Sequence, residues 1–352
     1  MEIRVYDRTL NLLGVVENHT ALIWTRKYYE PGNFELHAPI TRDNLTLLQP
    51  GNIITRRDKS LNLAVTEAGI IEGVENEDSD IKNEATRTGR FLSSYFDRRL
   101  ITNTVNFNGL SERAMHQLVN GVIPIPLLKM GGIQGFTETV EFQVTMRNLG
   151  TYLTKLSQAS GLGWRLRPDF TEKAIYFEVY KGVERTISQG INSRVIFSES
   201  YENLNNAIYR YNEQLYKTQA IVGGEGEGPA RVYVTVGGGA GLDLRQIFVD
   251  ARDIQSEGLT AAAYRAALAQ RGYENLNECI AAESLECETQ ADVNFKYKTH
   301  YDLGDIVTAR QEAWGIFINQ RITEIQEVYQ FGGMFVAPTL GNPMPDKIDW
   351  SD

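Results

Sequence analysis

The chain has 352 residues, of which 42% are hydrophobic and 23% are charged, and these fractions exclude wholesale disorder and a coiled-coil rod. Its net charge of -10, from 45 acidic and 35 basic residues, argues against a surface that mainly binds nucleic acid. No stretch supplies the ~18 consecutive apolar residues of a membrane span, and the first residues lack the apolar region of a secretory signal. Synthesis in a cytoplasm and two or three compact domains are therefore expected.

The first 75 residues predict strands. Alternating apolar and polar residues recur at positions 3–6, 21–29, 34–37, 52–56, 61–66 and 69–74. Glu30-Pro-Gly-Asn33 supplies a turn between two of them, so a hairpin is expected there. Short strands with polar turns at this spacing are typical of a barrel or a sandwich. The acidic run 75–80 lacks the spacing of a calcium loop and is interpreted as a solvated hairpin tip.

Helical patterns appear after residue 88. Ser111 precedes an apolar stripe and predicts an N-capped helix, a second helix begins near Asn148 and stops at Gly161, and Thr260 caps a third over about 259–273. Strand patterns return at 164–166, 174–180, several points within 195–236, and from 293 onward. Helices beside antiparallel strands place the chain in a β-rich α+β class.

The usual signatures of catalysis and of cofactor binding are missing from the sequence. Glycine runs at 223–228 and 237–241 lack the spacing of dinucleotide and phosphate loops, and we interpret them as turns. The four histidines lie far apart, without a zinc-hydrolase motif. Cys279 and Cys287 are too few for a disulfide framework or a thiolate metal site. We therefore expect no catalytic residue, no cofactor and no metal.

Two features leave alternatives open. Asp250, Arg252 and Asp253 form the most concentrated charged cluster, which predicts a contact network more readily than an acid–base pair. The 17 tyrosines suit protein interfaces or cross-strand packing. The alternative functions are a β-rich carbohydrate-active enzyme that uses carboxylates such as Asp250 or Glu324, and a carbohydrate-binding module.

Several segments together resemble the tail-hub family of siphophages and prophages, the baseplate hub or tail-associated protein at the distal end of the tail tube. They are WTRKYYEPGNFEL at 24–36, YENLNNAIY at 201–209, GEGEG at 224–228 with Arg231, FVDARDI at 248–254, YDLGDIV at 301–307 and RITEI at 321–325. Each motif is weak by itself. Their order and spread over about 300 residues make the resemblance specific.

The resemblance implies two tube-type β-barrels with α+β and helical insertions, in a homotrimer whose six barrels continue the sixfold tail tube. It implies a non-enzymatic part of the virion tail, assembled in the cytoplasm of the bacterial host. Expected partners are a tail tube or distal tail protein, a tail-tip or receptor-binding protein and the tape-measure protein. DNA would pass through without specific binding, and an acidic lumen would repel its phosphates.

The expected division of the chain follows from the same resemblance. Its parts are a first barrel of 1–88 with about 195–236, an α+β domain of 89–194, a helical insertion of 237–292, strands 293–340 that close a second barrel, and an extended arm of 341–352. Trp24, Tyr28 and Phe34 are expected to anchor the hairpin and barrel, and Asn203 and Asn206 to fix turns. The remaining structural or interface candidates are Asp250, Arg252, Asp253, Gly304, Asp305 and Glu324.

Overall fold

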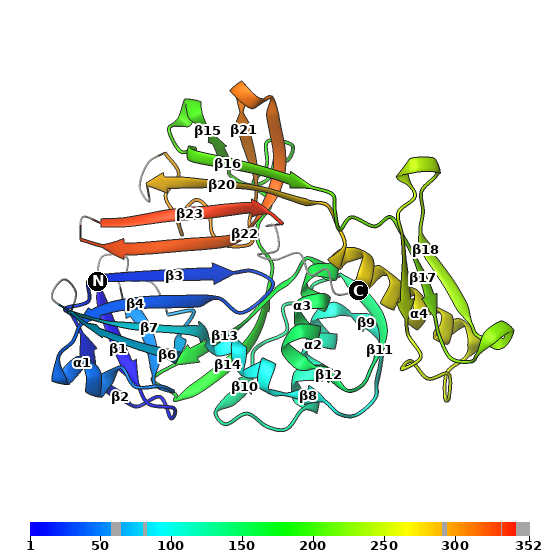
Figure 1. Ribbon diagram of the computed structural model, residues 1–352, viewed down its shortest axis with the longest axis horizontal. Helices are drawn as coiled ribbons and strands as arrows, with labels where there is room; N and C mark the ends of the chain where they lie inside the picture. The colour runs from blue at the N-terminus through cyan, green and yellow to red at the C-terminus, as the bar shows by residue number, and fades with distance from the viewer. Residues whose placement is uncertain (58–64, 80–82, 291–293, 332, 343–352) are drawn as a thin grey trace.

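The computed structural model describes residues 1–57, 65–79, 83–290, 294–331 and 333–342. A long sheet, a middle domain and a projecting arm make up the molecule (Figure 1). The predicted strand at 61–66 begins outside the described residues, and the predicted C-terminal arm falls largely outside them.

The long sheet contains 13 strands within the described residues. Its main path runs β16-β20-β23-β22-β3-β4-β7-β6-β5-β1-β2, and β21 and β15 branch from β22. The N-terminal strands are β1 (Glu2–Tyr6), β2 (Leu12–Val16), β3 (Ala21–Lys27), β4 (Asn33–Pro39), β5 (Ile53–Arg57), β6 (Gly69–Asp78) and β7 (Asn83–Phe91), with helix α1 (Arg42–Leu47) between β4 and β5. The C-terminal strands are β15 (Ile196–Ser198), β16 (Asn205–Asn212), β20 (Ala282–Gln290), β21 (Ile306–Gln311), β22 (Ile316–Gln330) and β23 (Gly333–Gly341).

Strand β22 joins the two halves of the sheet. Its first part pairs with β21, and residues 324–330 pair with β3 over residues 21–27. Each half has its own core: Trp24, Phe34 and Leu36 lie in the N-terminal one, and Phe197 and Ile325 in the C-terminal one. The fifteen-residue strand β22 therefore spans both cores.

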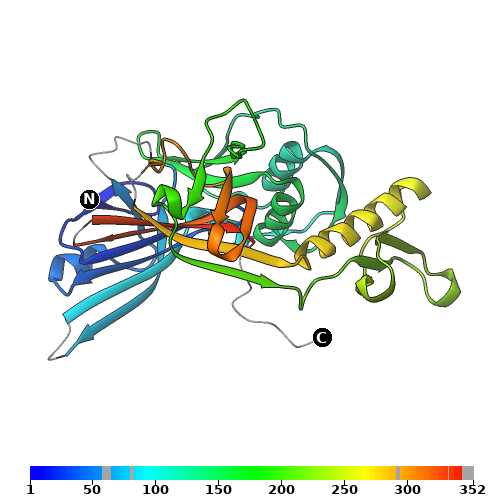
Figure 2. The same cartoon turned by 90° about the horizontal axis from the view of Figure 1, so that it is seen from above.

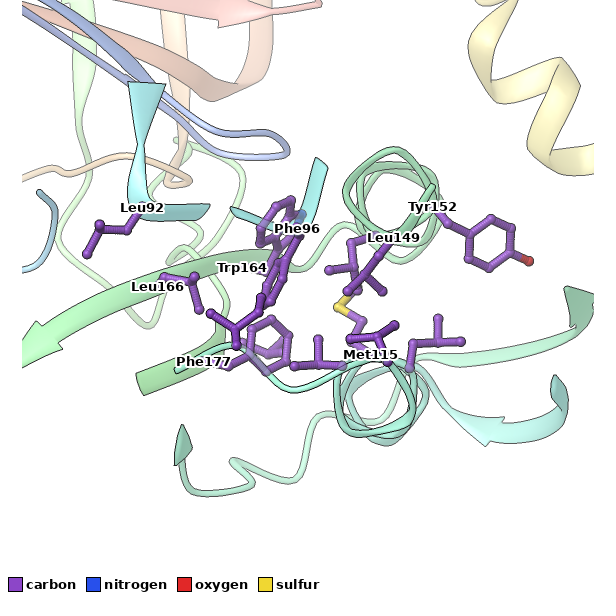
Figure 3. Close-up of a cluster of buried hydrophobic side chains, with 14 of the residues drawn as sticks. Leu92, Phe96, Met115, Leu149, Tyr152, Trp164, Leu166 and Phe177 are labelled. Carbon is purple, nitrogen blue, oxygen red and sulfur yellow. The ribbon is translucent and has the colours of Figure 1, made fainter. Parts of the chain in front are cut away.

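The middle domain packs helices beside short strands. It contains β8 (Leu100–Ile101), β9 (Val105–Leu110), α2 (Ser111–Gly121), β10 (Leu128–Met130), β11 (Thr139–Val144), β12 (Arg147–Asn148), α3 (Leu149–Ser160), β13 (Gly163–Asp169) and β14 (Ala174–Tyr180). Figure 3 shows its core, where Phe96, Met115, Trp164 and Phe177 lie among leucines from both helices. Buried apolar surface of this kind is the main stabilising contribution to such a domain.

The helix ends follow the predicted signals closely. Asn148 caps α3 by accepting a hydrogen bond from Thr151 N, and Gly161 closes the helix in the left-handed conformation, as expected. Thr260 caps α4 (Ala261–Glu278), which extends five residues past the predicted end at 273. Ser111 is the first helical residue of α2 and Leu110 holds the cap position, so the predicted cap is wrong by one residue.

The arm comprises residues 213–279 and projects from the body (Figures 1 and 2). Strands β17 (Gln219–Gly223), β18 (Tyr233–Gly237) and β19 (Gln246–Asp250) form a three-stranded sheet that packs one face on α4. Ala220, Val222 and Val236 lie in this separate core. The apolar face of the small sheet is thus covered within the arm.

Two parts of the predicted division differ from the strand pairing. The strands within residues 219–236 pair with each other in the arm, and β16 pairs with β20. Among the described strands, these segments therefore do not pair with the strands of residues 1–88. The region 237–292 contains β19 and β20 besides its helix. Burial of apolar residues against α4 and β20 decides these pairings, which strand patterns by themselves do not specify. The domain boundaries themselves remain a prediction.

The β-rich α+β class predicted from the sequence is confirmed. Across the described ranges, no helix is long and apolar enough to cross a membrane.

Candidate assembly surface and its buried support

The long sheet presents a polar face away from its cores. Alternate residues of each strand point to the same face, and the strand registers place them side by side across the sheet. One such row consists of Gln330, Ala21, His37, Thr86 and Glu75. All of these side chains are partly or fully exposed. Their neighbours of the other parity, including Leu22, Leu36 and Arg87, are buried. Over these rows, alternation gives the sheet one packed face and one largely solvated face; we call the second the outer face. Nearer the start of β6, Ile70 shares the parity of Arg90 but is buried in the core of the middle domain.

Acidic side chains predominate on the outer face. Within the described strands β16 to β6, it carries six acidic side chains, Glu35, Glu75, Glu77, Glu84, Glu286 and Glu324, and three basic ones, Lys27, Arg90 and Arg210. The basic groups are held in ion pairs: Lys27 with Glu30 and Glu324, Arg90 with Glu72 and Asp97, and Arg210 with Glu286. The outer face is therefore negative overall.

His37 lies on this face between two carboxylates. Its Nε2 is 2.7 Å from a Glu35 oxygen, and its Nδ1 is 2.8 Å from a Glu84 oxygen. Partial burial opposes protonation, but the hydrogen bonds to Glu84 and Glu35 prevail and raise the pKa of His37. The imidazole thus partly neutralises a site where two acidic strands meet.

A buried charge network supports the sheet where its two halves join. The Arg56 guanidinium donates to both carboxylate oxygens of Glu327, at 2.6 Å each, although β5 and β22 are not neighbours in the sheet. Tyr297 and Tyr329 donate their hydroxyls to the same carboxylate at 2.7 and 2.6 Å. Glu327 is fully buried and well supplied with donors. Burial opposes ionisation, yet the charge of Arg56 holds the pKa of Glu327 well below its usual range.

Arg26 continues the network toward the loop before β21. It donates to Glu67 at 2.9 Å and to the Tyr297 hydroxyl at 2.8 Å, and it also pairs with Asp302. Burial opposes the ionisation of Glu67, but the charges of Arg26 and Arg56 lower its pKa to about 2. The network therefore ties β3, β5 and β22 to the loop segments that carry Glu67, Tyr297 and Asp302. We did not predict this network from the sequence, although Arg26 and Glu327 continue the inward-facing alternation of Trp24 and Ile325.

The three aromatic candidates are all core residues. Trp24, Tyr28 and Phe34 are at most 2% exposed. The Trp24 and Phe34 rings stack with centroids 5.9 Å apart, and the Arg56 guanidinium lies 4.9 Å from the Trp24 ring. The Tyr28 hydroxyl donates to the carbonyl of Gly161 at 3.1 Å and so connects the end of β3 to the middle domain.

The polar candidates near the second half of the sheet have distinct positions. Buried Asn203 accepts from Ser198 N at 2.8 Å and donates to the Ile196 carbonyl at 2.9 Å, which is the geometry of a turn-fixing residue. Asn206 is exposed and has a φ of 49°. Glu324 lies on the outer face, with its Oε2 3.9 Å from Lys27 Nζ. Their contribution to assembly remains a prediction.

Gly304 and Asp305 position the loop before β21. Gly304 has a φ of +93°, and a Cβ there would lie 2.2 Å from the Tyr28 ring, so the close approach requires glycine. Asp305 accepts from Val183 N and Arg185 Nε, both at 2.7 Å. Together they connect this loop to the segment after β14.

The cluster Asp250, Arg252 and Asp253 divides into two separate ion-pair groups in the arm. Asp250 binds Arg252 at 2.6 Å and Arg231 at 2.8 Å. Asp253 instead pairs with Arg147 of the middle domain and with Arg271 of α4. The hydrogen bonds from Arg252 lower the pKa of Asp250 to about 2, so this carboxyl is ill suited to donate a proton near neutral pH. Throughout the described part of the chain, no group of three or more metal-ligating side chains is placed to hold an ion.

The fold is that of prophage tail proteins. The 43 kDa tail protein of prophage MuSo2 from Shewanella oneidensis superposes with a TM-score of 0.60 at 12% identity, over 97% of this chain and 99% of its own. A tail protein from Neisseria meningitidis MC58 superposes with a TM-score of 0.60 at 12% identity, over 97% of this chain and 96% of its own. Prophage tail protein gp18 from Listeria monocytogenes EGD-e superposes with a TM-score of 0.52 at 12% identity, over 96% of this chain and 94% of its own.

The chain belongs to the Siphovirus ReqiPepy6 Gp37-like protein family, whose family model matches residues 2–342. Comparison with curated proteins gives no match. The resemblance to siphophage and prophage tail proteins seen in the sequence motifs is confirmed.

Proposed function

We propose that the chain is a structural hub of a phage tail, forming a homotrimeric ring that joins the sixfold tail tube to the tail tip. The observation that carries the proposal is the continuous outer face of the long sheet. This face is polar and acidic over β4, β7 and the outer part of β6, whereas its exposed large apolar side chains, Ile208 and Phe335, lie in the C-terminal half of the sheet. Such a face suits the wall of an aqueous channel. The two halves of the sheet are proposed to be the two tube-type units of each protomer.

The proposed ring contact uses two strand edges. Strand β16 has β20 as its one neighbour among the described strands, and β5 pairs with β6 only at residues 69 and 70. The outer part of β6 therefore offers a second edge, with Glu75, Glu77 and Asp78. The edge of β16 carries Arg210 and no acidic residue. A contact between different edges of successive copies is heterologous and forms a ring when the rotation closes.

Passage of DNA explains the charge of the outer face. Basic groups that neutralise phosphates release counterions and make DNA adhere, whereas an acidic wall gives no such attraction. The proposed role is non-enzymatic and lies in the virion tail, after assembly in the cytoplasm of the bacterial host. Proposed partners are a tail tube or distal tail protein at one rim, a tail-tip or receptor-binding protein at the other, and the tape-measure protein in the channel.

Symmetry-resolved imaging of assembled tails tests this function. We expect three copies in a ring, with Glu35 and Glu75 facing the lumen. A combined charge substitution, Glu75→Lys with Glu77→Lys, should weaken the ring contact and slow DNA release. Tails in which the chain is monomeric, or in which the outer face is covered by protein and lies away from the lumen, would overturn the proposal.

A further inference from the structure

We propose that residues 343–352, whose sequence is PMPDKIDWSD, occupy a groove between the middle domain and the arm of the same chain and hold the arm against the body. These ten residues lie outside the described ones. The groove, which we call the α3 groove, consists of two joined hollows beside helix α3. The inference goes beyond the proposed hub function and does not depend on it.

The α3 groove runs along the line where the arm meets the body. Helices α3 and α4 lie side by side there, and Lys155 Nζ of α3 is 2.8 Å from a carboxylate oxygen of Glu278 of α4 (Figure 1). A hollow of about 380 Å³ extends from this pair toward the long sheet, and one of about 500 Å³ extends toward β19. Thr151 and Lys155 line both hollows, so the two form one continuous groove.

The groove begins where the described chain ends. Asn342 lines the first hollow, and its N–H donates to the Glu283 carbonyl at 2.9 Å. The groove follows α3 from Gln158 to Asn148, which is roughly 15 Å along the helix axis. Eight extended residues span up to about 26 Å, so residues 343–350 are long enough to follow it. A tethered segment also competes at a high effective concentration, which favours this occupant over a separate protein.

Exposed apolar side chains lie at both ends of the groove. Leu215 and Ile280 line the first hollow, and each is 41% exposed. Met146 and Phe248 line the second hollow, and they are 68% and 55% exposed. An occupant with apolar side chains near both of its ends would therefore remove four large side chains from water, which stabilises the contact.

The sequence of residues 343–352 matches this division. Pro343 and Pro345 favour an extended backbone, as a narrow groove requires. Met344 follows Asn342 by two residues and so falls at the first hollow, whereas Trp350 comes six residues later and reaches the second. The segment thus supplies an apolar side chain for each end of the groove.

Strand β19 offers a free edge beside the second hollow. It is an outer strand of the small sheet, with β17 as its one neighbour among the described strands. At its two ends, the Arg245 carbonyl and the Ala251 N–H bond with β17. A parallel ladder with these bonds directs the odd-numbered residues toward β17, so the N–H and C=O groups of Gln246 and Phe248 point to the open side. An extended segment in the second hollow satisfies these groups by strand addition.

Hydrogen exchange at single-residue resolution tests the inference on the full chain and on a chain that stops after Asn342. Removal of residues 343–352 should speed exchange of the Gln246 and Phe248 N–H groups about tenfold, because they lose their partners. Ile247 and Val249, whose N–H groups bond with β17, are the matched internal controls and should change by less than about twofold. Equal exchange in the two chains, or an equal rise at all four positions, would overturn the inference.

Site-specific photo-crosslinking identifies the occupant directly. Trp350 is replaced by p-benzoylphenylalanine in the full chain, which is irradiated and analysed by mass spectrometry. We expect an adduct within the same chain, to residues 146–155 or 246–250, at a yield that does not depend on protein concentration. The same probe at fully exposed Phe331 is the control and should give no adduct in the groove. An adduct of position 350 with another copy or another tail protein, or no adduct at all, would contradict the assignment of the occupant.

Substitutions in the groove supply a third measurement. Met146→Ser and Phe248→Ser together should lower the yield of the adduct about fivefold, because the apolar contacts of the second hollow are lost. Ile191→Ser and Phe317→Ser, which remove exposed apolar side chains away from the groove, form the matched control and should leave the yield within about twofold. Unfolding temperatures should be unchanged because all four side chains are exposed. Trimeric rings in which the adduct does not form would refute the occupied groove and leave the hub function intact.

Discussion

The junction of the long sheet and the attachment of the arm both use arginine–carboxylate pairs, yet they differ in burial. At the junction, Glu327 is fully buried and Arg56 is 8% exposed at its side chain. At the arm, Asp253 is 33% exposed and its partner Arg147 is 50% exposed. The same chemistry should therefore be essential in the first region and nearly dispensable in the second, because water compensates an exposed charge that loses its partner.

The arm is also held mainly by polar contacts. Gln143 and Gln255 exchange two hydrogen bonds, at 2.7 and 3.1 Å, and the Tyr152 hydroxyl donates to buried Glu274 at 3.2 Å. Burial raises the pKa of Glu274, against the charge of nearby Arg271. The arm and middle domain keep separate apolar cores. The arm thus has its own apolar core and meets the body through these polar contacts, whereas the two halves of the sheet share one strand.

The largest effect is expected from Glu327→Ala. Removing this carboxylate takes away the two short bonds of buried Arg56 and leaves Glu67 3.8 Å away, which costs about 3–5 kcal/mol of the free energy of unfolding. Urea denaturation of the purified chain measures the loss. Glu286→Ala, which removes a partly exposed carboxylate from the outer face, serves as the control and should cost under about 1 kcal/mol. Equal losses in the two variants would contradict the distinction between buried and exposed pairs.

Acid should weaken the junction of the long sheet. The pKa of Glu67 falls from its ordinary value of 4.5 to about 2 on folding, and that of Glu327 also falls. A depressed folded pKa gives stability that is complete above the unfolded value and is lost as the pH drops toward the folded one. Stability should therefore decline between about pH 5 and pH 2. Glu327→Ala lacks one of the two groups, so its stability should fall less over this range; an unchanged slope would argue against the assignment.

A smaller loss is expected from Gly304→Ala, which probes the loop beside the junction. Its left-handed backbone and the Tyr28 ring 2.2 Å from a new Cβ combine strain with overpacking, at about 2–4 kcal/mol. Gly315 also has a positive φ, of +66°, but nothing lies within 4 Å of a Cβ added there. Gly315→Ala should therefore lower the free energy of unfolding by only about 1–2 kcal/mol. Thermal unfolding of both variants measures the difference. Similar values would show that the contact with Tyr28 is unimportant.

The smallest effect is expected at the arm. Asp253→Asn preserves the side-chain shape and removes a partly exposed charge, while buried Arg271 keeps Glu274 at 3.7 Å as a second ionic partner. The free energy of unfolding should therefore change by less than about 1 kcal/mol. Hydrogen exchange in residues 143–152 and 253–274 should still rise slightly as the docking loosens. A loss comparable with that of Glu327→Ala would mean that the arm and body unfold as one cooperative unit.

Much of the local structure was predictable because its signals are local. Asn148, Gly161 and Thr260 mark helix ends through hydrogen bonds to backbone groups a few residues away, and these ends are confirmed. The hairpin at Glu30-Pro-Gly-Asn33 connects β3 to β4 as expected. The motifs spread along the chain also indicated the correct kind of protein, since family resemblance depends on order and spacing.

Among the candidate residues, those with contacts inside their own segment were predictable, and those with distant partners were not. Asn203 fixes a turn within its own segment, as its side chain type suggested. Asp250 and Asp253, three residues apart, bind different partners because the chain turns between them and brings in Arg231, Arg147 and Arg271 from distant positions. Spacing in the sequence did not contain that information.

Composition, alternation and capping residues determined the β-rich class, the helix ends and the acidic character of the chain. The pairing of β22 with β3, the separate arm, and the meeting of Arg56 with Glu327 across 271 positions were decided by the tertiary structure. The physical reason is that strand patterns specify which face is buried but not which strand lies beside it. Partner choice depends on packing and charge compensation between segments far apart in the chain.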